Sequence, residues 1–412
     1  MARFFYITRD DKGRKNSGAE EGFSQEEVIS RLQARGLLVV SVTPESKDAA
    51  SGVKTDFKGG RLKFKHYGVS SDDLVLFCRQ LATLLGAGVT ILKSIDIISL
   101  QVSSRRLFAI LKKLQKDMEA GLSLHEAMSK HPAAFSELWV NLVESGEASG
   151  NLAMILNRLA TYLERNAAFK KKIISALIYP IILMIAGFGA LLFLTVKIIP
   201  TFAELFKGFN VKLPLLTQIL VNVSHFVRSN FLFFIIIAAV AIFMLRKYIR
   251  TKEGRRQYEK LKFNLPTFGD FFRGLVIERF SSEMSTLVES GVPILYSLEI
   301  AEHSVGNLIM ADIIRSIKED VRGGKTLSQP LARSGFFEPM VVQMVAIGEE
   351  IGELPQMFKK INAFYQDYVE TFLTRFAAMF EPIMLIFMGV VIGIMVIGMF
   401  LPIFQISQMG AG

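Results

Sequence analysis

Residues 77–94, FCRQLATLLGAGVTILKS, return later in the chain as residues 280–297, FSSEMSTLVESGVPILYS. The identities in register are Phe77 with Phe280, Thr83 with Thr286, Leu84 with Leu287, Gly88 with Gly291, Val89 with Val292, Leu92 with Leu295, and Ser94 with Ser297. This agreement indicates an internal duplication, which has to be recognised before a fold class is assigned. Leu74, Phe77 and Leu81 follow helical spacing, so each copy is expected to fold as an α-helical bundle.

The duplication continues beyond this window with one slip of a single residue. The later matches are Phe135 with Phe337, Val143 with Val345, Gly146 with Gly348, Glu147 with Glu349, Gly150 with Gly352, Leu152 with Leu354, Pro180 with Pro382, Pro200 with Pro402, and Phe202 with Phe404. Ser123 with Glu126, and Thr326 with Gln329, predict capping boxes at equivalent helix starts. The predicted bundles are residues 66–172 for repeat 1 and 247–380 for repeat 2.

Three stretches are apolar for long enough to cross a bilayer, which takes about 20 helical residues. They are residues 173–196, 229–246 and 381–405. The first and the third end the two copies, whereas the middle one lies outside the duplication. If both bundles lie on one side of the membrane, the chain must cross back once between them, and the middle span supplies that crossing.

Basic residues indicate the side of the membrane on which the bundles lie. Residues 170–172 are lysines in front of the first span, and residues 246–247 are Arg and Lys after the second. The positive-inside rule therefore places both bundles and the N-terminus in the cytoplasm, and residues 197–228 and the C-terminus in the periplasm. The first residues lack a long apolar stretch, so neither a cleaved leader nor an N-terminal anchor is expected.

A small α/β module and a linker are predicted ahead of the duplication. Residues 4–8 and 37–42 are rich in aromatic or β-branched side chains and predict strands. Ser24 with Glu27 predicts a helix start between them. The module is assigned to residues 1–45. Residues 46–65 mix Lys, Gly, Ser and Asp with few apolar residues, which is the composition of a flexible linker.

Composition and motifs argue against several classes of function. Lys and Arg number 48 against 38 Asp and Glu, but the excess flanks the spans and no aromatic-interleaved basic surface accompanies it, so no nucleic-acid partner is expected. Residues 324–326 imitate the end of a P-loop, but Glu319 stands where that loop needs its first glycine. His125 and His131 do not have metal-binding helical spacing. A single cysteine, Cys78, cannot form an internal disulfide. We predict no catalytic residue, cofactor or metal ion.

The pattern Gly-Glu-x-x-Gly-x-Leu occurs once in each copy. The candidate residues are Gly146, Glu147 and Gly150 in repeat 1, and Gly348, Glu349 and Gly352 in repeat 2. One interpretation is a helix–helix connection, in which the glycines permit positive φ or close backbone approach and the acid favours the N-terminus of the next helix. The other is direct contact with a partner, in which the carboxylates bind a cation or an arginine. The first is favoured, and the sequence leaves both open.

The third span carries further candidates. Glu381 precedes Pro382 at its entrance, where the first copy has Tyr179. Ionisable groups within a membrane are expensive and usually paired, so Glu381 is either interfacial or in contact with another chain. Gly389 and Gly393 form a small-xxx-small face, which allows close helix packing within the protein or between subunits.

Together, the duplicated helical region, the three spans, the paired Gly-Glu-x-x-Gly-x-Leu segments and Glu381-Pro382 resemble the type II secretion F / type IV pilus platform family. The resemblance extends over almost the whole chain. It implies a multi-pass scaffold of the bacterial inner membrane that is not an enzyme. It also implies binding to a cytoplasmic assembly ATPase, to pilin or pseudopilin subunits, to other inner-membrane assembly components and to membrane lipid, and assembly as a homo-oligomer.

Two other classes fit the sequence less well. A small-molecule transporter usually has more spans, with polar or broken helices near the middle of the membrane. A membrane sensor needs an outer ligand domain, for which residues 197–228 are too few. The sequence does not decide between a pilus, a secretion system and a competence system.

Overall fold

The computed structural model describes residues 2–9, 15–34, 38–44, 64–208 and 213–410. The chain divides into two units, Met1–Lys63 and Phe64–Gly412, which are treated separately. Apart from its last two residues, the predicted linker at 46–65 lies outside the described residues.

The N-terminal unit is a three-stranded antiparallel sheet with one helix. Its elements are β1 (Ala2–Arg9), β2 (Lys15–Gly22), α1 (Gln25–Ala34) and β3 (Leu38–Pro44), and β1 lies between β2 and β3. The residues buried between helix and sheet are Phe4, Val28, Leu32 and Val42. The predicted α/β character is confirmed. The sequence does not predict β2, because KNSGAEEG lacks β-branched and aromatic residues and only its pairing with β1 makes it a strand.

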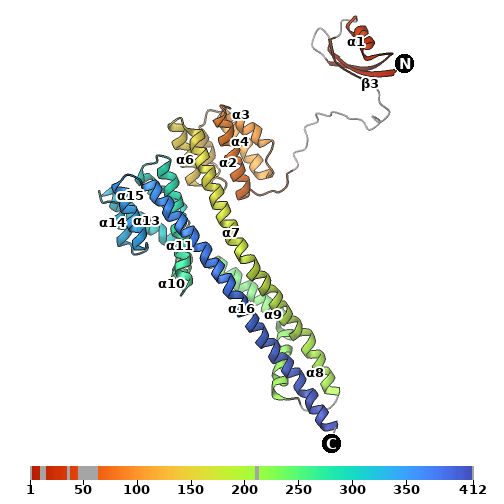
Figure 1. Ribbon diagram of the computed structural model, residues 1–412, viewed down its shortest axis with the longest axis vertical. Helices are drawn as coiled ribbons and strands as arrows, with labels where there is room; N and C mark the ends of the chain where they lie inside the picture. The colour runs from red at the N-terminus through yellow and green to blue at the C-terminus, as the bar shows by residue number, and fades with distance from the viewer. Residues whose placement is uncertain (1, 10–14, 35–37, 45–63, 209–212, 411–412) are drawn as a thin grey trace. The chain divides into compact units, whose positions relative to one another are not determined.

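The second unit contains two runs of helices in the same order (Figure 1). Repeat 1 comprises α2 (Ser71–Gly86), α3 (Ile91–Ser99), α4 (Arg105–Glu119), α5 (Leu124–Ser129), α6 (Glu137–Ala148) and α7 (Leu152–Phe193). Repeat 2 comprises α11 (Phe268–Glu289), α12 (Ile294–Ser304), α13 (Leu308–Arg322), α14 (Ser328–Arg333), α15 (Pro339–Glu350) and α16 (Leu354–Gly410). The prediction of a mainly α chain with two related helical bundles is confirmed.

Equivalent aromatic residues lie at the centre of both bundles. In repeat 1, Phe77 packs against Phe135 and Trp139, with ring centroids 6.0 and 6.2 Å apart. In repeat 2, Phe280 packs against Phe337, with ring centroids 5.7 Å apart. All of these side chains are buried, so the identities found in the sequence are core positions.

The last helix of each repeat continues from the bundle into a predicted span. Candidate spans, judged by length and hydropathy, are Leu152–Phe206, Leu215–Ile249 and Leu354–Phe404. No helix boundary occurs at the predicted junctions of residues 172–173 and 380–381. Both junctions lie inside single helices, since α7 runs for 42 residues and α16 for 57. At 1.5 Å per residue, α7 is about 63 Å long, which exceeds the roughly 30 Å of hydrocarbon in a bilayer.

Four helical elements connect the two repeats. They are η1 (Leu194–Ile198), which is a π-helical segment, α8 (Ile199–Gly208), α9 (Leu215–Ile249) and α10 (Lys252–Asn264). The predicted middle span, residues 229–246, lies within α9, which begins earlier than the sequence indicates. Residues 197–228 therefore include α8 and the first turns of α9. Side chains such as Leu232, 71% exposed, and Ile386, 69% exposed, leave apolar surface on the span helices, as contact with lipid requires.

Candidate functional site

Glu147 holds the N-terminus of a short helix in repeat 1. Its two carboxylate oxygens accept hydrogen bonds from the backbone N–H groups of Leu124, at 2.7 Å, and His125, at 3.2 Å. The Nδ1 atom of His125 also lies 2.6 Å from Glu147 Oε2. These amides begin α5, and the first amides of a helix have no partner within it. A carboxylate at this place also interacts favourably with the positive end of the helix dipole.

Glu349 makes the equivalent contacts in repeat 2. Its carboxylate accepts hydrogen bonds from the backbone N–H of Leu327, at 2.6 Å, and of Ser328, at 3.3 Å. The predicted capping box of Thr326 and Gln329 is wrong. Leu327 is the N-cap of α14, and no side chain within that segment caps the helix. In repeat 1 the predicted box is present, with Ser123 and Glu126 bonded reciprocally.

The glycines of the motif have two distinct geometries. Gly150 and Gly352 have φ of +70° and +74°, a left-handed conformation that glycine adopts without steric penalty. Gly146 and Gly348 are approached closely by the following helix, since a Cβ on Gly348 would lie 2.7 Å from Met357 Cγ. The sequence anticipated both geometries.

The helix that the acid serves differs from the expected one. The interpretation favoured from the sequence places the acid at the N-terminus of the next helix, α7 or α16. Both glutamates instead reach back to the short helix before their own, α5 or α14. The motif therefore fastens three consecutive helices of each bundle, since its glycines admit the following helix while its carboxylate holds the earlier one.

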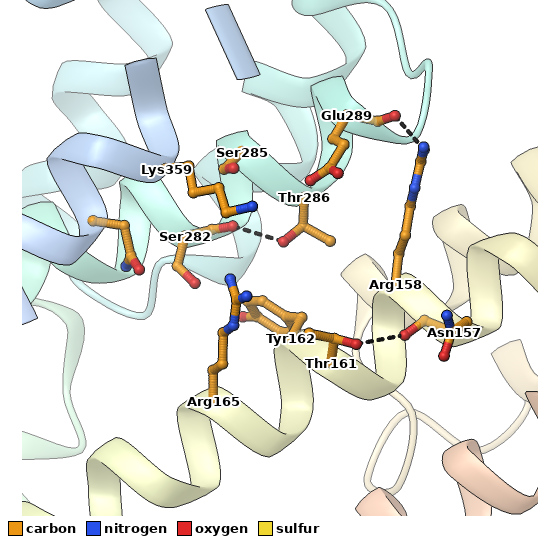
Figure 2. A pocket seen from close by; sticks show the side chains of 11 residues that line it. Asn157, Arg158, Thr161, Tyr162, Arg165, Ser282, Ser285, Thr286, Glu289 and Lys359 are labelled. Carbon is orange, nitrogen blue, oxygen red and sulfur yellow. Dashed lines mark hydrogen bonds between the residues drawn. The ribbon is translucent and has the colours of Figure 1, made fainter. Parts of the chain in front are cut away.

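The two repeats also contact each other directly. Arg158 of α7 donates a hydrogen bond to the backbone carbonyl of Glu289 in α11 (Figure 2). Tyr296 of α12 donates to Asn141 Oδ1 of α6 at 2.6 Å. Leu287, Val292 and Ile300 of repeat 2 belong to the hydrophobic core of repeat 1. No sequence signal predicts these contacts, the joint between the repeats, because the residues that make them share no motif.

A buried polar group lies beside the joint. The Glu283 carboxylate of α11 accepts hydrogen bonds from Arg279 Nε, at 3.1 Å, and Ser304 Oγ, at 2.5 Å, and the hydroxyl of Tyr162 donates to it at 3.5 Å. Burial raises the pKa of Glu283 and also that of Tyr162. Burial likewise raises the pKa of Glu278, which accepts hydrogen bonds from Asn362 and Gln366 of α16.

Further contacts join α7 to repeat 2 near the predicted membrane boundary. Lys172 forms an ion pair with Glu370 of α16, with Nζ and Oε1 2.7 Å apart. A hydrophobic cluster beside it contains Phe169 of α7, Phe271 of α11, and Val369 and Leu373 of α16. The two long helices are thus fastened to each other just before the predicted spans begin.

Most candidate residues of the third span lie on the exposed surface of α16, whereas Gly393 is half-buried. Glu381 and Pro382 are exposed, and the carboxylate of Glu381 interacts with the hydroxyl of Tyr179 on α7. The structure therefore brings together the two residues that occupy equivalent positions in the copies. A Cβ added to Gly389 or Gly393 would meet no atom within 4 Å. On the side where a Cβ would stand, neither glycine is in close contact with a described residue of another helix.

Other small residues make the close helix contacts in the spans, and no motif in the sequence marks them. A Cβ on Gly398 would overlap Leu220 of α9, and a Cβ on Gly187 would lie 3.3 Å from Met388 of α16. The hydroxyl of Thr217 donates to the carbonyl of Gly398 at 2.5 Å. No periodic pattern distinguishes these glycines from the others in the spans.

Among the residues that the structure describes, no three or more His, Cys, Asp and Glu side chains form a group that could hold a metal ion. The duplicated bundles and the three long apolar helices define the class of protein: an integral membrane protein in which two related helical bundles are continuous with helices long and apolar enough to cross a membrane.

Comparison with known proteins identifies the family within that class. Residues 77–200 and 280–402 match the family described as type II secretion system (T2SS), protein F, and residues 1–43 match the type II secretion system protein F N-terminal domain. The chain is 38% identical over 407 residues to the type IV pilus assembly protein PilC of Thermus thermophilus, covering 98% of each chain. It is 33% identical over 409 residues to the type II secretion system protein F of Pseudomonas aeruginosa, covering 99% of this chain and 100% of that one.

This protein belongs to the type II secretion system protein F family, whose members are structural platform proteins. The family resemblance inferred from the repeat, the spans and the paired motifs is confirmed. Three apolar helices and this membership fit a protein of the inner membrane.

Proposed function

We propose that this protein is the inner-membrane platform of a type IV pilus or type II secretion machine, on which a cytoplasmic ATPase drives pilin or pseudopilin subunits into a filament. The observation that carries the proposal is the continuity of α7 and α16 from the helical bundles into the spans. The names of the relatives, which describe pilus assembly and type II secretion, support the same assignment.

Continuous helices give a direct mechanical route. A shift of either bundle caused by the ATPase tilts or rotates the helix that leaves it, because an unbroken helix transmits displacement along its axis. The hydrophobic cluster around Phe169 and Val369, together with the ion pair of Lys172 with Glu370, couples the two helices, so both spans respond to motion of one bundle. Subunits lying against the spans would then be displaced toward the growing filament.

The proposal also includes the sidedness that the basic residues beside the spans indicate and the partners that the family resemblance implies. The N-terminal module, residues 1–45, and the bundles, residues 66–172 and 247–380, face the cytoplasm and the ATPase. Residues 197–228 and the C-terminus face the periplasm. The chain itself hydrolyses nothing, since ATP hydrolysis belongs to its partner. Other inner-membrane components and lipid surround the spans, and further copies of the chain complete a homo-oligomer.

We assign the motif residues two different roles. Gly146, Glu147 and Gly150, with their equivalents Gly348, Glu349 and Gly352, keep each bundle rigid enough to move as one body. The exposed Glu381, beside Pro382, contacts a pilin subunit or a second platform chain. The open face of Gly389 and Gly393 receives another helix.

The test of the function is genetic and biochemical. Deletion of the gene should abolish surface filaments or secretion of type II substrates, and the full-length protein purified in mild detergent should retain the assembly ATPase. If filaments and secretion both persist in the deletion strain, the proposed function is wrong.

The test of the membrane contact is cross-linking. A photo-activated cross-linker at position 381 should capture pilin or pseudopilin, or a second platform chain, in native membranes. A cross-linker at Ile236, which is 52% exposed on α9, is the matched control. Equal yields at both positions would mean that Glu381 marks no specific contact.

A further inference from the structure

A polar cavity of about 210 Å³ lies between the two repeats (Figure 2). Its walls come from α7 of repeat 1 and from α11 and the first turns of α16 of repeat 2. Both Thr161 on α7 and Thr286 on α11 line it. A ligand that filled this cavity would touch both copies of the duplication, so its binding would be linked to how the copies are arranged.

The charge of the cavity is predominantly positive. Arg158, Arg165 and Lys359 line it together with a single carboxylate, Glu289. Arg158 is bonded to the backbone carbonyl of Glu289. Arg165 and Lys359, in contrast, have no hydrogen bond or ion pair with any residue that the structure describes. Two solvent-exposed cations that have no ion-pair partner among the described residues therefore face a shared space.

The floor of the cavity supplies a third donor. Ser282 is 9% exposed, and its hydroxyl makes no hydrogen bond with the described residues. The neighbouring hydroxyls are occupied, since Thr286 donates to the carbonyl of Ser282 at 2.8 Å and Ser285 to that of Pro355 at 3.2 Å. Figure 2 shows the Arg165 and Lys359 side chains extending from opposite walls toward this part of α11. The free groups come from three helices and are all donors.

We propose that this cavity binds a small oxyanion of the phosphate class, held by Arg165, Lys359 and Ser282. Guanidinium and ammonium groups form strong, charge-assisted hydrogen bonds to phosphate oxygens. The volume lies below the roughly 300–1,000 Å³ of typical pockets for drug-sized ligands, so it suits phosphate or diphosphate rather than a whole nucleotide. A bound anion neutralises two cations and bridges α7 to α11 and α16, which stabilises the joint between the repeats. This site is independent of the platform function.

Binding is tested with inorganic phosphate and the full-length protein in nanodiscs of zwitterionic lipid. Calorimetric titration at constant ionic strength should show saturable binding. Lys359→Gln and Arg165→Gln should each weaken it about tenfold or more, because each removes a charge-assisted hydrogen bond. Ser282→Ala should weaken it about fivefold. Lys360→Gln is the matched control, since this neighbouring lysine is exposed like Lys359 but does not line the cavity.

A second readout separates ligand binding from folding defects. Phosphate should raise the thermal unfolding temperature of the wild type and of Lys360→Gln, and should leave that of Lys359→Gln unchanged. Parallel titrations with pyrophosphate, ATP and nanodiscs of anionic lipid identify the natural source of the phosphoryl group. Equal phosphate affinity in wild type and Lys359→Gln, or absence of saturable binding by any of these probes, would overturn the proposal.

Discussion

Removing the Glu349 carboxylate should release the N-terminus of α14 while the rest of repeat 2 stays folded. The carboxylate accepts two backbone hydrogen bonds, at 2.6 and 3.3 Å, and α14 has no other side-chain cap. Hydrogen bonds to a charged group contribute about 1.5–3 kcal/mol each, and loss of an N-cap costs about 0.5–2 kcal/mol. We therefore expect Glu349→Ala to lower the free energy of local opening by about 2 kcal/mol.

Hydrogen exchange measured by mass spectrometry is the suitable assay, because it reports opening segment by segment. A loss of about 2 kcal/mol corresponds to roughly thirtyfold faster exchange in a peptide spanning residues 324–334. Glu350→Ala, which removes the adjacent exposed acid, is the control and should leave that peptide unchanged. Equal exchange in the two variants would refute the capping role. Glu147→Ala should produce a smaller effect on α5, because Ser123 also caps that helix.

Three further predictions concern stability. Gly352→Ala should lower the free energy of unfolding by about 1–2 kcal/mol, because φ is +74° at that position. Gly189→Ala, in open space on α7, should be neutral or stabilising. Thermal unfolding of the two variants distinguishes these outcomes. Burial raises the pKa of Glu278, so its contribution to stability is fully present below its unfolded pKa of about 4.3 and is lost as pH rises through the folded pKa. Glu278→Gln should therefore gain stability relative to wild type as the pH rises above about 4.3. If chemical denaturation shows the same difference in the free energy of unfolding at every pH above that value, the assignment is contradicted. Gly398→Ala should lower the unfolding temperature because its Cβ overlaps Leu220, whereas Gly389→Ala should not; equal effects in the purified chain would show that the α9–α16 contact is not as close as described.

The motif glutamates show what a repeated pattern in a sequence can predict and what it cannot. Recurrence of Gly-Glu-x-x-Gly-x-Leu selected Glu147 and Glu349, and the glycine geometries followed from simple backbone rules. The sequence does not predict which helices the glutamates bind. A carboxylate can reach the N-terminus of either neighbouring helix, and only packing decides which one is near. The capping box predicted at Thr326 is wrong for a related reason, because packing and not the local sequence decides what caps α14. With Glu349 bound to the amides of Leu327 and Ser328, α14 starts without a capping side chain of its own.

For the glycines of the spans, a sequence motif selected residues that do not make the close contacts. Gly389 and Gly393 have the spacing of a packing face, yet no described residue of another helix is in close contact with the side where a Cβ would stand, whereas Gly398 and Gly187 make the close contacts. Spacing reports which residues share one face of a helix. It does not report which face is turned toward a neighbour within the same chain.

The duplicated helical bundles, the three apolar helices and the family to which they belong can all be predicted from the amino-acid sequence. These properties are periodic or local, so hydrophobic spacing and turn residues encode them directly. Three features are visible only in the folded chain: α7 and α16 run unbroken out of the bundles, Arg158 and Tyr296 join the repeats, and Arg165 and Lys359 share a cavity. Contacts of this second kind depend on the rotation and register of helices far apart in the chain, which side-chain packing sets and periodicity leaves free.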